Sequence, residues 1–411
     1  MIDYSPKYLV MVAPGANNNK YYKMIPEGDS FRVEFGRVGG SHQTRSYSMS
    51  QWGKKYSEKI NKGYVDRTSL MEDLIKKEKP KAKTPDGFRD IENKAIAEIV
   101  DRLQAMAKKA VAENYTVSSD KVTMAMVDEA QKCLAQIVDM AGKDETTVED
   151  FNKELIELFG VIPRKMGNVA DHIAHQISDF GRIVEHEQDL LDIMKGQVYV
   201  PPVEQEEEEV NPVLEGKTIL EDRGLVFEEA TPEDIVKIKS CLGSCENKFY
   251  RAWRVRNLRT QKEFDDYVAK ENIKTKLLWH GSRNENWWSI INSGLVLKPT
   301  NAVITGKMFG YGIYFATKAQ KSLGYTSLSG SYWARGSSSS AFMGLYEVAY
   351  GKPYDVHSFE SRYSSLTYDK LQQACPGAHC VHAHEGQMLR NDEIIVYQEC
   401  QTTVKYLVEL R

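Results

Sequence analysis

The chain has 411 residues, which is too long for one compact core and predicts two or three domains. Its composition, 41% hydrophobic and 27% charged, is typical of a soluble globular protein, and no apolar run is long enough to predict a membrane span. The N-terminus lacks the features of a secretory signal, and six scattered cysteines form no disulfide framework, so we expect a reducing intracellular compartment. The net charge of −4 excludes a uniformly basic protein, but the charge is unevenly distributed.

The first 75 residues alternate polar and apolar side chains over short stretches. Turn sequences separate these stretches at 14–19, 26–29 and 39–40. This pattern predicts a small antiparallel sheet built from hairpins, followed by one helix over 48–64.

The N-terminal segment is also basic. Residues 1–84 hold 16 Lys and Arg against 9 Asp and Glu, whereas the remainder holds 38 against 49. Such a split predicts that the segment meets a polyanion. A solvated basic surface followed by a basic linker at 76–83 is the alternative.

The hydrophobic period changes to that of helices over 88–196, which predicts a helical bundle. Thr147 begins a capping sequence for one of these helices. His172 and His175 would lie on one helical face, where surface histidines are a better interpretation than a metal pair. Two further helices are expected at 165–180 and 181–195.

An acidic, proline-containing linker is expected at 197–212, and residues 213–411 read as mostly β. The expected strands are 225–229, 249–255, 276–279, 312–316, 345–350, 393–397 and 404–410. The expected short helices are near 232–241, 261–270, 285–293 and 317–324.

The stretch LLWHGSR, residues 277–283, ends an apolar strand on His280. A core histidine is the simplest interpretation of these residues alone. About thirty residues later, two aromatic rings, Tyr314 and Tyr325, flank Ser322, a set suited to a flat ring that carries an amide. The FGYG sequence before Tyr314 lacks the rest of a dinucleotide-binding fingerprint, so it does not indicate a dehydrogenase.

Glu393 precedes the apolar run of another strand, where its carboxylate could enter a cleft or simply be solvated. His280, Tyr314 and Glu393, in this order, resemble the His-Tyr-Glu signature of poly(ADP-ribose) polymerases. EFGRVGG at 34–40 resembles the WGR domain of that family. The resemblance implies a multidomain α+β fold with a WGR-like sheet-and-helix domain, an all-α regulatory bundle and a mixed, mostly β ADP-ribosyltransferase domain. The corresponding boundaries are 1–78, 88–196 and 213–411.

In that family NAD is a substrate and no metal is required. The resemblance implies that the backbone of Gly281 holds the nicotinamide carboxamide and that Ser322 completes this clamp. Tyr325 and Tyr314 would stack on the two faces of the nicotinamide ring.

On the adenosine side, the resemblance places His280 on the ribose, with Ser282 and Asn286 nearby. Glu393 would hydrogen-bond the nicotinamide ribose and activate the acceptor hydroxyl. Cleavage of the glycosidic bond builds oxocarbenium character, which a nearby carboxylate stabilises.

The family motif Trp-Gly-Arg contacts DNA strand ends, and here the triplet is Phe35-Gly36-Arg37. Arg37 can fork onto a phosphate and Phe35 can pack on a sugar or base, although the indole donor is missing. The resemblance therefore implies DNA strand breaks as a partner and a helical domain that restrains NAD access until DNA binds.

The expected function is DNA-dependent poly(ADP-ribosyl) transfer in DNA repair, to protein acceptors that include the chain itself. A mono-ADP-ribosyltransferase, an inactive DNA-end-binding scaffold and an NAD hydrolase are the alternatives. We expect a monomer without membrane contact, in the nucleus of a eukaryote or the cytoplasm and nucleoid of a prokaryote.

Two loops stand apart from this scheme. The serine-rich loop at 327–342 is expected to be a flexible tip, with self-modification sites as the alternative. The segment CPGAHCVHAHEG at 375–386 carries cysteines and histidines, but their spacing matches no common four-ligand zinc site. We expect an exposed or acceptor-contacting loop there and no metal site, with structural zinc as the alternative.

Overall fold

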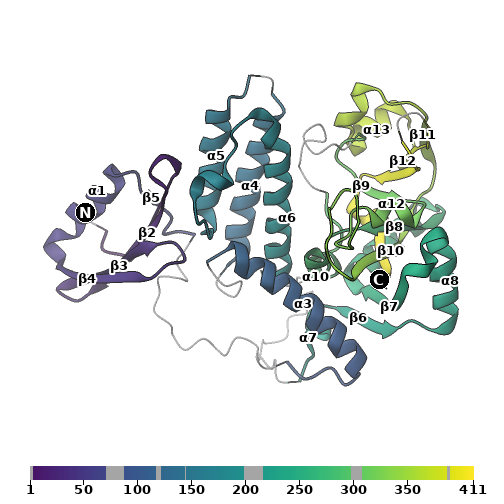
Figure 1. Ribbon diagram of the computed structural model, residues 1–411, viewed down its shortest axis with the longest axis horizontal. Coiled ribbons are helices and arrows are strands. Elements are labelled where there is room, and N and C mark those ends of the chain that lie inside the picture. The colour runs from purple at the N-terminus through teal and green to yellow at the C-terminus, as the bar shows by residue number, and fades with distance from the viewer. Residues whose placement is uncertain are drawn as a thin grey trace. The chain divides into compact units, whose positions relative to one another are not determined.

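The chain forms two compact units in the computed structural model, and each is considered separately (Figure 1). The first combines Met1–Thr84 with Lys108–Val198, and the second combines Pro85–Ala107 with Tyr199–Arg411. The structure describes residues 3–70, 88–116, 122–143, 145–198, 216–297, 308–386 and 389–411. The predicted linker sequences at 76–83 and 201–212 lie outside these residues.

An antiparallel sheet of five strands, in the order β4-β3-β2-β1-β5, begins the first unit. The strands are β1 Lys7–Ala13, β2 Asn18–Glu27, β3 Ser30–Arg37, β4 His42–Ser48 and β5 Val65–Asp66. The first three contain the apolar alternations of the sequence at 8–12, 20–25 and 31–35, as predicted for strands. The alternation of apolar side chains does not reveal β4, because this edge strand exposes nearly all of its residues.

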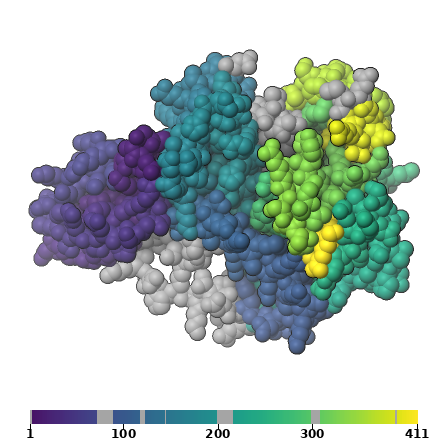
Figure 2. All heavy atoms as spheres, in the orientation of Figure 1, coloured from purple at the N-terminus to yellow at the C-terminus, as the bar shows by residue number. Residues whose placement is uncertain are grey.

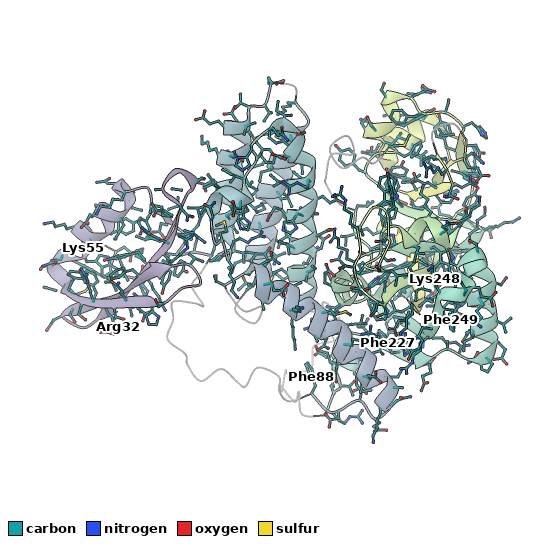
Figure 3. The ribbon with its side chains drawn as sticks, viewed as in Figure 1. Arg32, Lys55, Phe88, Phe227, Lys248 and Phe249 are labelled. Atoms are coloured by element: carbon teal, nitrogen blue, oxygen red, sulfur yellow. The ribbon has the colours of Figure 1, made fainter. Side chains whose placement is uncertain are left out.

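The predicted N-terminal helix is α1, Trp52–Asn61, which packs on this sheet. Trp52 is almost fully buried, and its ring meets Phe31 edge-on at a centroid distance of 5.0 Å. Arg32 and Lys55 are labelled on this part in Figure 3, and they pair with Glu27 and Glu58 at 2.9 and 3.3 Å. Some of the basic surplus is therefore neutralised locally. In Figure 2 the side chains of this part, in purple, form a continuous surface.

Helices complete the first unit. They are α4 Met124–Ala141, α5 Val148–Val161, α6 Phe180–Val198 and the last part of α3 Lys94–Asn114. The predicted cap of α5 is confirmed, because the Thr147 hydroxyl accepts a hydrogen bond from the Asp150 N–H at 3.1 Å.

The helix predicted at 165–180 is wrong. Only two short 3₁₀ turns form there, Val169–His172 and Ile177–Asp179. The Asp179 carboxylate accepts the backbone N–H groups of His175 and Gln176, so it caps a new helix instead of continuing an old one. His172 and His175 consequently share no helical face, and burial lowers the pKa of His172, which favours its neutral form.

An ion pair is buried among these helices. Arg164 donates to both carboxylate oxygens of Glu187 at 2.8 and 2.9 Å, and both side chains are nearly inaccessible to water. The guanidinium also lies over the ring of Tyr115 at 5.0 Å. A bidentate pair of this kind compensates two desolvated charges only while both partners are present.

Replacing Arg164 with Met should lower the free energy of unfolding by about 3–5 kcal/mol, because Glu187 is left buried without its partner. Urea denaturation of the full chain measures this change. The double variant Arg164→Met/Glu187→Leu should recover most of the loss. The control Arg182→Met, at a largely exposed guanidinium, should leave the transition unchanged. A single variant as stable as the wild type would contradict the role of the pair.

The second unit is built on a mixed sheet of nine strands in the order β11-β12-β13-β9-β8-β10-β14-β7-β6. The strands are β6 Leu225–Glu229, β7 Phe249–Asn257, β8 Thr275–Gly281, β9 Ile313–Ala316, β10 Ala341–Ala349, β11 Pro353–Val356, β12 Cys380–Ala383, β13 Glu393–Val396 and β14 Thr402–Leu410. The neighbouring strands pair antiparallel, except β11 with β12, which are parallel. Phe227 on β6 and Phe249 on β7 can be followed in Figure 3.

Short helices surround this sheet. They are α7 Ile219–Asp222, α8 Pro232–Leu242, α9 Leu258–Glu271, α10 Trp287–Ser293, α12 Ala319–Leu323 and α13 Tyr368–Ala374. The four predicted helices are confirmed as α8, α9, α10 and α12. Part of the segment predicted as a loop at 375–386 is instead β12, because Cys380, Val381 and Ala383 are buried in the sheet.

The first part of α3 belongs to the second unit and is tied to its sheet. Arg102 donates to the buried carboxylate of Glu409 on β14 at 2.8 Å and to the Ser340 hydroxyl at 2.7 Å. All six cysteines are free, as predicted. Among the described helices, none combines the length and apolar character needed to cross a membrane.

Candidate active site

Three neighbouring strands carry the three predicted catalytic residues. His280 lies near the end of β8, Tyr314 on β9 and Glu393 at the start of β13, and the sheet order is β13-β9-β8. Trp279 and Glu393 both pair with Ala316, from opposite sides. Residues more than a hundred positions apart in the sequence are thus brought together. Glu393 shares the sheet face of Tyr314, because its partner Ala316 lies two residues after Tyr314.

The side chain of His280 is bound to the backbone of Tyr314. Its Nδ1 lies 3.0 Å from the carbonyl oxygen of Tyr314. Its ring meets Phe315 and Tyr346 edge-on, with centroid distances of 5.8 and 6.0 Å. Because the carbonyl oxygen accepts, the hydrogen bond requires the proton on Nδ1 and leaves Nε2 as an acceptor. An imidazole fixed in this tautomer can accept a hydrogen bond from a ribose hydroxyl.

Gly281 is required by the close approach of helix α12. A Cβ at Gly281 would lie 2.0 Å from the carbonyl oxygen of Ser322. The Ser322 hydroxyl is buried and donates to the carbonyl oxygen of Trp279 at 3.0 Å. The structure therefore brings together Gly281 and Ser322, the two residues predicted to clamp a carboxamide.

Tyr314 is held by the glycine-rich turn before it. Its hydroxyl donates to the Gly310 carbonyl at 3.0 Å and accepts the Phe309 N–H at the same distance. Gly310 has φ +74°, and a Cβ there would collide with the backbone of Leu366. Burial raises the pKa of Tyr314 far above its usual range, so its hydroxyl stays neutral. Tyr314 therefore offers a fixed ring and not a proton-transfer group.

Tyr325 stands at the open side of this region with 42% of its surface exposed. Its ring is stacked on that of Trp333, with centroids 6.1 Å apart and an interplanar angle of 17°. Trp333 comes from the serine-rich loop and is itself exposed. The sequence pattern gave no reason to expect this residue beside the site, because loop aromatics carry no periodicity.

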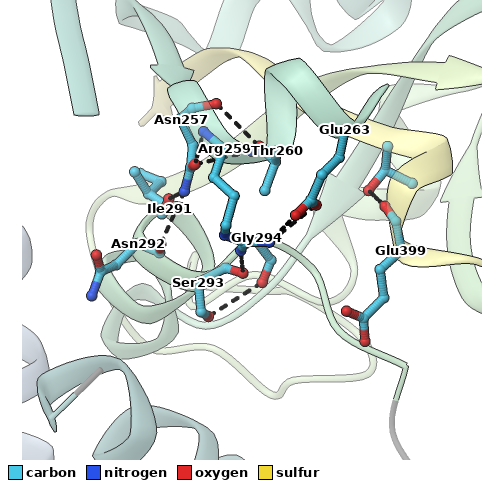
Figure 4. A network of polar contacts seen from close by, with 10 residues as sticks. Asn257, Arg259, Thr260, Glu263, Ile291, Asn292, Ser293, Gly294 and Glu399 are labelled. Carbon is cyan, nitrogen blue, oxygen red and sulfur yellow. Dashed lines mark hydrogen bonds and ion pairs between the residues drawn. The ribbon is translucent and has the colours of Figure 1, made fainter. Parts of the chain in front are cut away.

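The predicted adenosine-side residues are also connected. Asn286 Nδ2 donates to the Ser282 hydroxyl at 2.9 Å, and Asn286 Oδ1 is buried without a hydrogen-bond partner in the described part of the chain. The following helix, α10, is anchored by Asn257, whose amide donates to the carbonyls of Ile291 and Asn292 at 3.0 and 2.9 Å (Figure 4). This network fixes the helix that begins directly after Asn286.

Lys321 completes the site, and it was not predicted. Its ammonium forms an ion pair with Glu393, and both side chains are largely buried, with 13% and 12% of their surfaces exposed. Lys321 lies on α12 immediately before Ser322. The sequence offered a weak signal, a lysine next to a predicted clamp residue, but its partner is 72 positions away.

Comparison with known proteins agrees with this geometry. Residues 234–411 match the poly(ADP-ribose) polymerase catalytic domain. A putative poly [ADP-ribose] polymerase-like protein of Invertebrate iridescent virus 6 is 31% identical over 40% of this chain and 87% of its own length. The chain belongs to the poly(ADP-ribose) polymerase family. The human poly [ADP-ribose] polymerase 2 is 24% identical over 96% of this chain and 77% of its own length. The poly [ADP-ribose] polymerase 2 of Zea mays is 25% identical over 93% of this chain and 63% of its own length.

As a member of the poly(ADP-ribose) polymerase family, the chain is an NAD ADP-ribosyltransferase, and its catalytic domain uses NAD as a substrate. The described residues suit this reaction. The approach of Gly281 to Ser322 leaves backbone groups available to a carboxamide, and the Glu393 carboxylate can stabilise positive charge on the ribose. The same carboxylate can accept the proton of an attacking hydroxyl.

Replacing Lys321 with Met should lower kcat of this polymerase-family enzyme about tenfold to a hundredfold, because Glu393 loses the cation that holds its carboxylate in place. Initial rates with labelled NAD measure the effect. The control is Lys318→Met, three residues before Lys321. It breaks an exposed ion pair with Glu385 and should leave the rate unchanged. Equal rates for both variants would show that Lys321 does not position Glu393.

The predicted DNA-binding triplet of this family member lies on β3 in the first unit. Phe35 packs against Tyr22, with ring centroids 6.0 Å apart, and Gly36 leaves no room for a Cβ beside the Ser41 carbonyl. Arg37 donates to the carbonyl oxygens of Asn17, Met166 and Gly167 at 2.7, 3.0 and 2.7 Å. Its guanidinium thus connects the sheet to the segment before α6.

Proposed function

We propose that the chain is a poly(ADP-ribosyl)transferase that DNA strand breaks stimulate. The observation that supports polymer formation is Glu393. This carboxylate is largely buried on the face of Tyr314 and held by Lys321, where a carboxylate can orient the hydroxyl of a growing polymer. The relatives matched over most of the chain carry the name poly [ADP-ribose] polymerase 2, which is consistent with this proposal.

Incorporation of labelled NAD, separated by size on a gel, tests polymer formation. We expect a ladder of long products on the chain itself and on added protein acceptors. Product of one ADP-ribose per site would instead establish the alternative, mono-ADP-ribosyl transfer.

The DNA partner is supported by charge and by Arg37. The first 84 residues carry a basic surplus, and Arg37 can exchange carbonyl acceptors for a phosphate, which binds a guanidinium more strongly. That exchange would free Met166 and Gly167 from Arg37. Because these residues lie between α5 and α6, their release would link DNA binding to the helices of the first unit. Through this link the helices restrain NAD turnover until DNA is bound.

Nicked duplex DNA should bind the chain with an affinity that falls steeply as salt rises, and it should raise the rate of NAD consumption. Arg37→Ala should raise the rate without DNA, because it frees the segment at Met166 and Gly167, and it should reduce the further stimulation by DNA. A binding constant independent of salt, or full stimulation of Arg37→Ala, would contradict the proposal for this residue.

We also propose that the enzyme acts as a monomer inside the cell, in the nucleus of a eukaryote or at the nucleoid of a prokaryote, in the repair of broken DNA. Light scattering with and without nicked DNA tests the first point, and fluorescence imaging before and after DNA damage tests the second.

A further inference from the structure

A second cluster of chemically active side chains lies at the edge of the large sheet. Strands β11 and β12 run parallel there, with Asp355 directly opposite His382. His384 follows directly after β12, and its ring lies against that of His382. One ligand atom from each of Asp355, His382 and His384 lies within 4.8 Å of the others.

The contacts within this cluster are close. His384 Nε2 lies 2.7 Å from Asp355 Oδ1, and His382 Nδ1 lies 3.8 Å from the same oxygen. The rings of His382 and His384 are stacked with centroids 3.9 Å apart, and His357 stacks on His384 at 4.3 Å. The two imidazoles and the Asp355 carboxylate thus present their ligand atoms at one place on the sheet edge.

Asp392 determines which nitrogen of His382 is available. Its Oδ2 lies 3.1 Å from His382 Nε2, and its Oδ1 accepts the Glu385 N–H at 2.7 Å. An ionised carboxylate only accepts, so this hydrogen bond places the imidazole proton on Nε2. Nδ1 then accepts a hydrogen bond from the Tyr350 hydroxyl at 2.8 Å and lies 3.8 Å from Asp355 Oδ1, so a bound metal would take the place of the Tyr350 proton at this lone pair. A carboxylate that orients a ligating histidine in this way is the usual outer sphere of a metal site.

The other residues of the cysteine- and histidine-rich segment are turned elsewhere. Cys380 Sγ is buried and contacts the carbonyl of Tyr350 at 3.3 Å. His379 Nδ1 accepts the N–H of Lys352 at 3.0 Å. The sequence cluster is thus divided by the fold, and the ligand set gains Asp355 from another strand.

We propose that Asp355, His382 and His384 bind a divalent transition metal, with zinc as the best match. Two imidazole nitrogens and one carboxylate oxygen form a ligand set that zinc accepts, whereas magnesium and calcium prefer oxygen alone. The carboxylate of Asp355 is half exposed, so the fourth position is open to water.

The bound metal would stabilise the strands that carry Glu393. It bridges β11 to β12, and β12 pairs with β13, where Ala383 lies opposite Glu393. Asp392, which orients His382, is the residue immediately before Glu393. The metal is therefore assigned a structural role at the edge of the active site, independent of which product the enzyme makes.

Zinc titration of the full, chelator-treated chain tests the site in the absence of NAD. We expect one equivalent to bind by calorimetry and to raise the melting temperature by several degrees. Cobalt(II) should give the visible absorption of a low-coordinate site. His384→Ala and Asp355→Asn should each lower zinc affinity at least tenfold, and Asp392→Asn about 10–100-fold.

The matched control is His379→Gln, in the same segment but outside the ligand set, which should bind zinc as the wild type does. The melting temperatures of the chelator-treated variants show whether they fold. Absent binding in the wild type, or binding that neither His384→Ala nor Asp355→Asn weakens, would overturn the site.

Discussion

Glu393→Gln should lower kcat about 10²–10³-fold and abolish chain elongation, while the KM for NAD changes little. The amide keeps the shape of the side chain, but it cannot accept the proton of the attacking hydroxyl or stabilise positive charge on the ribose. The ion pair with Lys321 is lost in the same substitution. Initial rates and product size, both measured with labelled NAD, check the two effects separately.

The matched control is Glu385→Gln, an exposed glutamate in the segment before β13 that pairs with Lys318 at 2.7 Å. This variant should retain both rate and polymer length. If Glu393→Gln still made polymer of near-normal length, the assignment of Glu393 to elongation would be wrong, although the membership of the family would stand.

The strands of the active site could be predicted because each contains a short apolar run. His280 and Glu393 lie close to the ends of β8 and β13, whereas Tyr314 lies within the apolar run of β9. The order in which the strands assemble was not predictable from these runs, since any permutation would bury the same side chains. The resemblance to a family predicted that His280, Tyr314 and Glu393 share one site, but it did not predict the order of the strands.

Other features depend on contacts that no local pattern records. Lys321 is assigned to the site only by its contact with Glu393. Asp355 lies in a strand of four residues, which is too short for an alternation to be visible. Only the register of β11 with β12 places Asp355 beside His382. The error at 165–180 has a local cause, because Asp179 caps a helix and its carboxylate competes with helical hydrogen bonds.

Gly281→Ala should raise the KM for NAD more than tenfold and lower the free energy of unfolding by about 1–3 kcal/mol. The added methyl group would lie 2.0 Å from the Ser322 carbonyl oxygen, and this atom belongs to the backbone of α12, which cannot rotate away. The helix must move, and Ser322, Lys321 and the carboxamide clamp move with it. Gly386→Ala, at a glycine with open space, is the control and should change neither quantity. Ser322→Ala removes only a hydroxyl, so it should weaken NAD binding with a smaller loss of stability. Normal NAD binding by Gly281→Ala would mean that the approach of α12 to β8 does not shape the nicotinamide site.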